Sequence, residues 1–210
     1  MKLYHAKGSP NSRRVRILIA EKGLDIEFVP VDLGSKEQFS DAYRAINPRV
    51  VVPTLVLDDG TVIGEVPAIQ RYLDEAYPDL PLLGVTPKEK AVIAMWDRRV
   101  EAEGFASVMD AIRNTVAGLK DRAISGPHAY EQIPALAERS KKRLGNFYGD
   151  LEARLKEAPF VAGEAFSVAD ITALVTVDFA TNGIAMPIPE DATATKAWYE
   201  KVAARPSATA

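Results

Sequence analysis

The residues from Val50 to Leu55 combine an apolar run with a proline that ends it and begins a strand. Proline has no main-chain N–H, so it suits a bend or the edge of a sheet rather than its centre. The Val52–Pro53 peptide is a candidate for the cis form, because X–Pro bonds adopt it at modest cost. Such a bend leaves the N–H and C=O of Val52 available to an extended peptide, which would add as an extra strand. A loop proline before an edge strand is the plainer alternative.

A second group of polar residues lies at the predicted start of a helix. Ser9 is placed as an N-cap and Pro10 as the first helical residue. Asn11 and Ser12 fall in the same turn. A helix N-terminus carries partial positive charge and free N–H groups, which favour an anionic group.

The first 77 residues alternate strand and helix signals in the order β-α-β-α-β-β-α. Strands are predicted over 3–6, 26–31, 54–57 and 61–63, with Asp58-Asp59-Gly60 as a hairpin turn between the last two. Helices are predicted from Pro10 to a C-terminal cap at Gly23, over 39–46, and over 68–76.

Prolines and glycines crowd the next segment, so residues 79–87 are predicted to be a linker between domain 1–78 and domain 88–210. Beyond it the apolar spacing is helical: a long helix from Val92 past Ile112, another over 136–155, and a short one around Trp198. Ser167 to Asp170 forms a capping box before the nearly all-apolar segment 171–179, which suits a helix buried on every side. No strand pattern follows Gly84. The predicted fold class is α/β followed by all-α.

Composition excludes several classes of site. The chain has 210 residues, 47% of them hydrophobic, with a net charge of −3 and no cysteine. It therefore has neither a cysteine nucleophile nor a thiolate metal site, and His5 and His128 alone make a zinc site improbable. The charge gives no general reason to bind nucleic acid. Arg13, Arg14 and Arg16 stand at helical spacing and are expected to form a solvated face. The absence of a secretory or membrane-spanning segment makes a cytoplasmic protein the default expectation.

Four sequence pieces in order carry a family resemblance. They are Leu3-Tyr4 followed by residues 9–16, Asn47-Pro48 leading to residues 52–55, the turn at 58–60 leading to Glu65 and residues 68–69, and Phe160-Val161-Ala162-Gly163 ahead of residues 166–170. Together they resemble the cytosolic glutathione transferases, closest to the bacterial, serine-type classes, over nearly the whole chain. The resemblance implies a thioredoxin-like N-terminal domain, an all-helical C-terminal domain, glutathione as co-substrate without a metal, and a detoxifying homodimer in the cytoplasm.

By this resemblance, Ser9 matches the family's catalytic serine. Its hydroxyl would donate a hydrogen bond to the glutathione sulfur, favouring the thiolate over a thiol of pKa about 8.5. Asn11 is the second candidate because some relatives use asparagine here, and Ser12 is the third. An ordinary N-cap is the alternative for Ser9. Because the chain lacks cysteine, the nucleophilic sulfur must come from glutathione, which favours conjugation over thiol transfer.

The resemblance also implies how glutathione is held. Val52 would pair with the cysteinyl part, with Pro53 keeping that main chain open, and Glu65 would take the γ-glutamyl ammonium. The family's usual serine after Glu65 is replaced by Val66, and Pro67 removes a further donor. Only main-chain N–H groups such as that of Val66 remain for the γ-glutamyl carboxylate, so weaker glutathione binding is expected.

The remaining assignments concern the glycyl carboxylate, the electrophile and the partners. Lys36 is the candidate for the glycyl carboxylate, with a solvated lysine as the alternative. Phe105, Met109, Ile112 and Arg113 are candidates for an apolar electrophile pocket, with core packing or a surface arginine as the alternative. The predicted activity is addition of the thiolate to hydrophobic electrophiles. A protein of this fold without transferase activity, acting in ligand binding or protein interaction, is the alternative function, and a specialised enzyme such as an isomerase is a third.

Overall fold

The computed structural model describes all 210 residues. They form two compact units, each of which is described by itself. The first contains Met1–Leu80, Ser125–His128 and Ala210, and the second contains Pro81–Ile124 and Ala129–Thr209. The division at Leu80 falls inside the segment predicted to be a linker, while the limits given for the two domains stay a prediction.

The first unit has the predicted order of elements. These are β1 (Lys2–His5), α1 (Pro10–Glu21), β2 (Glu27–Pro30), the 3-10 helix η1 (Glu37–Phe39), α2 (Asp41–Ile46), β3 (Thr54–Val56), β4 (Val62–Ile63) and α3 (Val66–Ala76). Gly23 has φ +60° and ends α1, because its N–H bonds to Ala20 C=O in a conformation that suits glycine.

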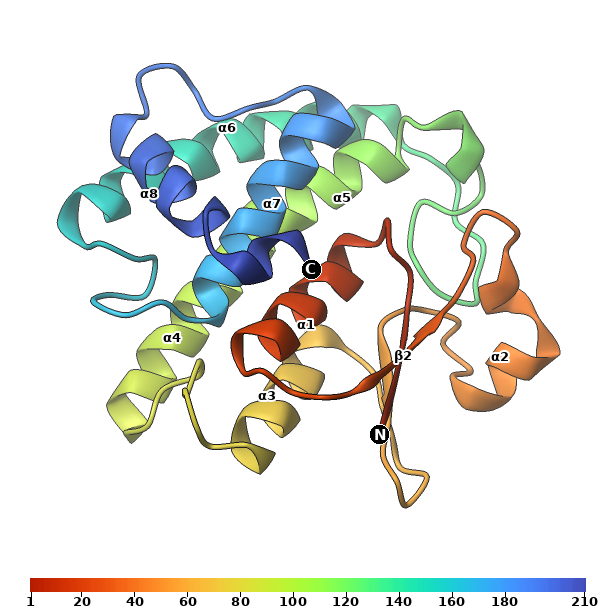
Figure 1. Ribbon diagram of the computed structural model, residues 1–210. Helices are drawn as coiled ribbons and strands as arrows, with labels where there is room; N and C mark the ends of the chain where they lie inside the picture. Colours follow the sequence, from red (N-terminus) through yellow and green to blue (C-terminus); the bar gives the residue numbers. More distant parts are fainter. The chain divides into compact units, whose positions relative to one another are not determined.

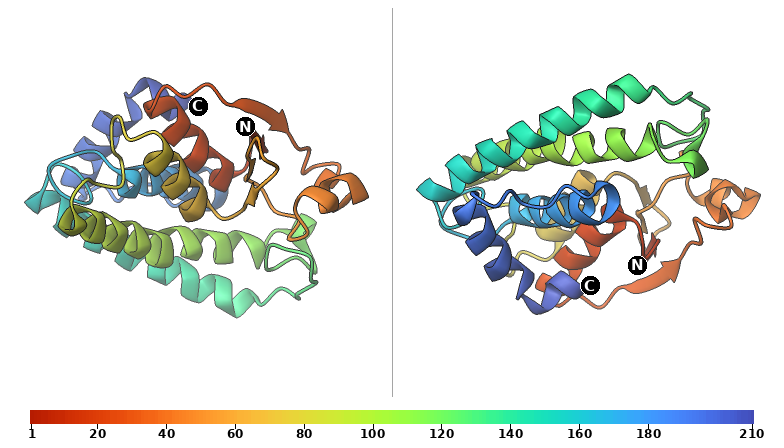
Figure 2. Two further views of the ribbon diagram at one scale, coloured as in Figure 1. Left: turned by 90° about the horizontal axis from the view of Figure 1, so that it is seen from below. Right: turned by 90° about the horizontal axis from the view of Figure 1, so that it is seen from above.

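A mixed four-stranded sheet lies at the centre of the first unit, in the order β2-β1-β3-β4. β1 is parallel to β2 and antiparallel to β3, and β3 is antiparallel to β4. Helices α1 and α3 pack together on one side of the sheet and α2 lies on the other (Figures 1 and 2). Leu3 and Leu55 are directly opposite each other and fully buried, which fixes the register of β1 and β3.

The second unit is helical. It contains α4 (Pro87–Arg99), the π-helix η2 (Val100–Phe105), α5 (Ala106–Arg113), the 3-10 helix η3 (Ala117–Leu119), α6 (Pro134–Glu157), α7 (Val168–Ile184), α8 (Thr193–Ala203) and the 3-10 turn η4 (Pro206–Thr209). Only two isolated bridges occur here, so the all-helical prediction is confirmed. α4, η2 and α5 run on without a break, and α6 lies along them in both views of Figure 2.

Helix α7 forms the core of the second unit, as the nearly all-apolar segment 171–179 predicted. It contacts α4, η2, α5 and α8, and the side chains of Ile171, Ala173 and Leu174 are at most 1% exposed. The capping box is present: Ser167 and Asp170 each bond to the other's main chain at the start of α7. Asp170 additionally accepts from Val161 N–H and Trp198 Nε1, both at 2.9 Å. The buried Asp170 carboxylate thus joins α7 to α8 and to the loop before α7.

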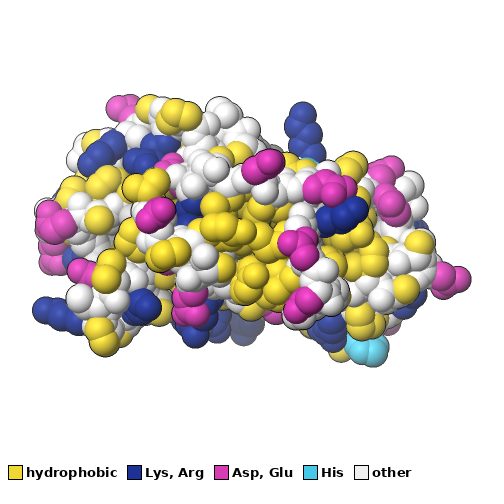
Figure 3. All heavy atoms as spheres, turned by 60° about the horizontal axis from the view of Figure 1, so that its bottom comes forward, with side chains coloured by type: hydrophobic (Ala, Val, Ile, Leu, Met, Phe, Trp, Pro, Cys, Tyr) yellow, Lys and Arg dark blue, Asp and Glu magenta, His cyan; other side chains and the backbone are white.

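The surface mixes apolar and charged groups. Figure 3 shows apolar side chains at the surface among acidic and basic ones. No helix combines the length and apolar character needed to cross a membrane.

Candidate active site

The sheet topology brings four segments of the first unit to one end of the sheet. β1 and β2 are parallel, so both point their carboxyl ends there, towards the segments that begin at Ala6 and Val31. β3 runs the other way, so its first residue, Thr54, pairs with Tyr4. β4 is antiparallel to β3 and therefore ends there as well, ahead of Glu65. The loop before Ser9, the Val52–Pro53 pair and the start of α3 are consequently neighbours.

Ser9 caps α1 and keeps its hydroxyl hydrogen available. Its backbone is extended (φ −84°, ψ 120°), and its Oγ accepts the N–H of Ser12 at 3.3 Å. No group of the protein accepts a hydrogen bond from the Ser9 hydroxyl. Because the cap uses an oxygen lone pair, the O–H can still donate to a ligand. The N-cap and the proposed thiolate donor are therefore compatible roles for one side chain.

The other two polar residues of this turn lie differently. Ser12 is fully buried, and its Oγ accepts the N–H of Ala6 at 3.2 Å, which ties α1 to the end of β1. Asn11 is partly exposed, and its Oδ1 lies 3.5 Å from Nη1 of Arg14.

The prediction of a solvated arginine face is wrong for Arg14 and Arg16. Arg14 is 1% and Arg16 is 7% exposed. Arg16 donates to the carbonyls of Ala6 (3.1 Å) and Lys7 (3.2 Å), and its Nη1 lies 3.2 Å from His5 Nδ1. Burial, and then the charge of Arg16, lower the pKa of His5. Helical spacing identified one face, but the loop carbonyls that Arg16 bonds become its neighbours only in the tertiary fold.

The Val52–Pro53 bond is cis. Val52 is 8% exposed, packs with Ala6, Val31 and Tyr43, and its N–H and C=O form no hydrogen bond within the protein. Buried main-chain N–H and C=O groups are normally hydrogen-bonded, so two groups without a partner beside a strand end are unusual.

The carbonyl of the preceding residue, Val51, is in contrast held by three donors. Tyr43 Oη lies at 2.6 Å, Asn47 Nδ2 at 3.1 Å and Thr54 Oγ1 at 3.1 Å. Asn47 Nδ2 also donates to Thr54 Oγ1 at 2.8 Å. Tyr43 falls within the helix predicted over 39–46, and its apolar spacing there gave no sign of this network. The Asn47-Pro48 pair was the one available signal.

The first turn of α3 carries Glu65 and Val66. Glu65 is exposed, precedes the helix with a positive φ (φ 64°, ψ 125°) and makes no side-chain capping bond. A positive φ is uncommon outside glycine and is frequent at functional sites. The Val66 N–H has no partner in the protein, and Pro67 has no N–H at all. Ala68 N–H is already bonded to Glu65 C=O at 3.1 Å. Val66 is therefore the one open donor among the first three helical residues.

Lys36 lies in the segment that follows β2. It is exposed, has φ 64° and begins η1. No contact joins its side chain to the other site residues, so its role stays a prediction.

The four residues assigned to an electrophile pocket all lie in the second unit, Phe105 at the end of η2 and the other three on α5. Phe105 is 5% exposed, and its ring centroid lies 5.9 Å from that of Phe179, so it packs in the core. Met109 and Ile112 are partly exposed. Arg113 donates to the carbonyl of Arg122. Burial, and then the charge of Arg122, lower the pKa of Arg113.

Comparisons with known proteins agree with this arrangement. Residues 3–81 match the family model of the glutathione S-transferase N-terminal domain, and residues 124–210 match that of the C-terminal domain. The chain belongs to the glutathione S-transferase family. Glutathione S-transferase 2 of Saccharomyces cerevisiae is 36% identical over 99% of this chain and 87% of its own.

Two further relatives show the range of the family. The solved structure of a glutathione S-transferase domain-containing protein of Marinobacter aquaeolei is 39% identical, covers 99% of both chains and superposes with a TM-score of 0.91. Maleylacetoacetate isomerase of Pseudomonas aeruginosa is 40% identical over 54% of this chain and 56% of its own. The thioredoxin-like fold of the first unit and the helical second part are thus both family features.

Proposed function

We propose that this glutathione S-transferase family member is a transferase that holds the glutathione thiolate at Ser9 and adds it to hydrophobic electrophiles. The observation that carries the proposal is the convergence of three open groups at one end of the sheet. They are the Ser9 O–H, the main chain of Val52 and the Val66 N–H beside Glu65.

Glutathione would bind as an extended strand. Its cysteinyl part would bond to the N–H and C=O of Val52, as peptides do when they extend a sheet. Its γ-glutamyl ammonium would pair with Glu65, and its γ-glutamyl carboxylate would accept from Val66 N–H at the positive end of α3. The glycyl carboxylate would be taken by Lys36.

The sulfur would then lie near the N-terminus of α1. The thiol proton leaves to solvent, and the resulting thiolate accepts the Ser9 hydroxyl hydrogen, which favours the charged form. Attack on an electrophilic carbon forms the C–S bond. In a substitution the leaving group departs with the bonding electron pair, and in an addition the adjacent atom takes a proton from solvent. The protein supplies no thiol of its own, since it has no cysteine.

The proposal includes an electrophile pocket formed by Phe105, Met109, Ile112 and Arg113. It also includes a homodimer in the cytoplasm. A protein that binds ligands without transferase activity is the alternative, and it predicts no turnover whatever the state of Ser9.

Ser9→Ala tests the assignment. The expected kcat/KM with glutathione and 1-chloro-2,4-dinitrobenzene falls about ten- to a hundred-fold near pH 7, because one hydrogen bond to a charged group is lost. The deficit should shrink as pH rises towards the pKa of free thiol, about 8.5. Thr86→Ala is the matched control, since it also removes an N-cap hydroxyl but in the second unit. A Ser9→Ala protein with full activity across the pH range would transfer the role to Asn11.

A further inference from the structure

Arg16 is a buried arginine on α1 that forms no ion pair with a carboxylate side chain. Burial, and then the charge of Arg13, lower the pKa of Arg16. Taking a guanidinium out of water costs free energy, and an apolar side chain often fills such a space at lower cost. The hydrogen bonds that Arg16 makes must therefore offset this cost.

The two Nη atoms of Arg16 hold consecutive carbonyls of the loop between β1 and α1. Nη1 donates to Ala6 C=O at 3.1 Å, and Nη2 donates to Lys7 C=O at 3.2 Å. Nη1 also lies 3.2 Å from His5 Nδ1, and Nη2 donates to Ala210 O at 3.4 Å. Arg16 is the one donor that the protein offers to Lys7 C=O.

These carbonyls lie immediately before Ser9 and belong to the hydrogen bonds that place it. Ala6 C=O also accepts the N–H of Ser9 at 3.1 Å. The N–H of Ala6 donates to Ser12 Oγ at 3.2 Å, and the N–H of Ser12 donates to Ser9 Oγ at 3.3 Å. A continuous set of hydrogen bonds thus runs from Arg16 through Ala6 to both the main chain and the hydroxyl of Ser9.

The planar shape of a guanidinium suits two adjacent acceptors. Its nitrogens are fixed in one plane, so the Ala6 and Lys7 carbonyls are held relative to each other as well as to α1. An ammonium is a single point donor on a flexible chain and cannot reproduce this geometry. Arg16→Lys therefore keeps the charge and loses the fork.

We infer that Arg16 is a positioning residue for the transferase reaction, which aims the Ser9 hydroxyl at the glutathione sulfur by fixing the loop before it. Arg16 acts only through the loop and contacts neither reactant. The inference rests on the proposed function, because that proposal gives Ser9 its role. Glutathione itself would still be held by Val52 and by the start of α3, to which Arg16 forms no hydrogen bond.

The first measurement is the pKa of the bound glutathione thiol, followed by the ultraviolet absorbance of the thiolate in a pH titration of the full chain with saturating glutathione. Arg16→Met should raise this pKa by about one pH unit, which corresponds to a ten-fold loss of thiolate stabilisation. With 1-chloro-2,4-dinitrobenzene near pH 7, kcat should fall about ten-fold, while KM for glutathione stays within about two-fold. Arg16→Lys should show about half of the change in thiol pKa.

The second measurement is a double-mutant cycle with Ser9→Ala. If Arg16 acts through the Ser9 hydroxyl, Arg16→Met should change the thiol pKa no further once that hydroxyl is absent. A purely structural role of Arg16 would give effects that add, and it would lower the free energy of unfolding without this coupling. Urea unfolding of each variant gives the stability separately.

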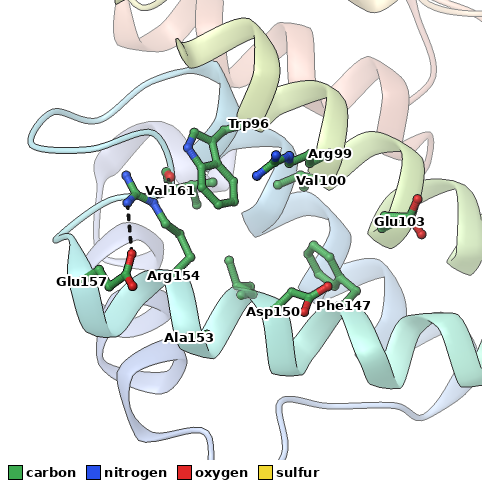
Figure 4. Close-up of a pocket in the computed structure, with 11 residues that line it drawn as sticks. Trp96, Arg99, Val100, Glu103, Phe147, Asp150, Ala153, Arg154, Glu157 and Val161 are labelled. Atoms are coloured by element: carbon green, nitrogen blue, oxygen red, sulfur yellow. Dashed lines mark hydrogen bonds and ion pairs between the residues drawn. The ribbon is translucent and has the colours of Figure 1, made fainter.

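The matched control is Arg154→Met in the second unit. Arg154 also donates to a loop carbonyl, from Nε to Val161 C=O at 2.9 Å. It lines a cavity of about 580 Å³ between the α4–η2 segment and α6, where Figure 4 shows it beside Trp96 and near Arg99. Arg154→Met should leave the thiol pKa unchanged, because none of its contacts reaches the loop before Ser9.

Three results would overturn the inference. The first is an unchanged thiol pKa in a folded Arg16→Met protein, or in Arg16→Lys where Arg16→Met does not fold. The second is additive effects of Ser9→Ala and Arg16→Met. Either result would leave the proposed function in place if Ser9→Ala alone raises the thiol pKa. The third is a Ser9→Ala protein with an unchanged thiol pKa, which would remove the role of Ser9 and the inference with it.

Discussion

The hydroxyl of Tyr43 donates a 2.6 Å hydrogen bond to the carbonyl of Val51, the residue before the Val52–Pro53 pair. Burial raises the pKa of Tyr43 above its ordinary value of 10, so the hydroxyl keeps its proton through the neutral range. This bond connects α2 to the main chain that the proposed glutathione site uses.

Tyr43→Phe should lower the free energy of unfolding by about 1 kcal/mol. The Tyr43 hydroxyl loses its bond to Val51 C=O and its 3.1 Å contact with Thr54 Oγ1, while Asn47 and Thr54 still hold the Val51 carbonyl. It should also weaken glutathione binding. Urea unfolding and calorimetry measure the two effects. Tyr130→Phe, at an exposed tyrosine, should change neither. Unchanged glutathione affinity in a destabilised Tyr43→Phe protein would limit the network to a structural role.

Val66→Ser should strengthen glutathione binding about ten-fold, since it adds a hydroxyl donor for the γ-glutamyl carboxylate beside the one open N–H. Val66 is 4% exposed, so some stability should be lost, and urea unfolding gives that loss separately. Ala76→Ser at the other end of α3 is the control. An affinity that does not improve would place the carboxylate away from the start of α3.

Asp170→Ala should lower the free energy of unfolding by about 3–4 kcal/mol. The change leaves buried donors of Val161, Ser167 and Trp198 without their acceptor. Chemical denaturation followed by circular dichroism measures it. Glu164→Ala, at an exposed acid in the same loop region, should stay within about 0.5 kcal/mol. A similarly small effect of Asp170→Ala would contradict the structural role given to this carboxylate.

Glu152 should contribute stability that depends on pH. Desolvation acts to raise its pKa, but hydrogen bonds from Thr195 and Ala194 at the start of α8 outweigh it and lower the pKa from 4.5 to about 2. When folding lowers the pKa of a carboxyl group, that group stabilises the folded state fully at pH values above its unfolded-state pKa. The stabilisation is lost as pH falls through the folded-state pKa. Glu152 therefore loses its stabilising effect between about pH 4.5 and about pH 2.

Glu152→Gln should consequently lower Tm by about 2–4 °C at pH 7, and the difference should shrink as pH falls from 4.5 towards 2. Thermal unfolding followed by circular dichroism over this range measures it. Glu157→Gln, at an exposed acid one turn further along α6, is the control. A Tm difference that is constant down to pH 2 would show that Glu152 acts through its shape rather than its charge.

The local elements were predictable because their signals are local. Ser9-Pro10 marks the start of α1 and Ser167 to Asp170 that of α7, and each depends on hydrogen bonds within one helical turn. The nearly all-apolar segment 171–179 likewise identifies the part of α7 that is buried. The order of strands and helices in the first unit followed from the same kind of pattern.

The sequence by itself determined the elements, the absence of a thiol and the replacement of the usual serine by Val66. Only the tertiary structure decided that Arg16 is buried on the loop carbonyls before Ser9, that three donors meet on Val51 C=O, and that Arg99 stands at a cavity beside Trp96. The physical reason is range: a cap or an amphipathic face is settled by residues a few positions apart, whereas these contacts join side chains to groups on other elements, and packing alone brings them within hydrogen-bond distance.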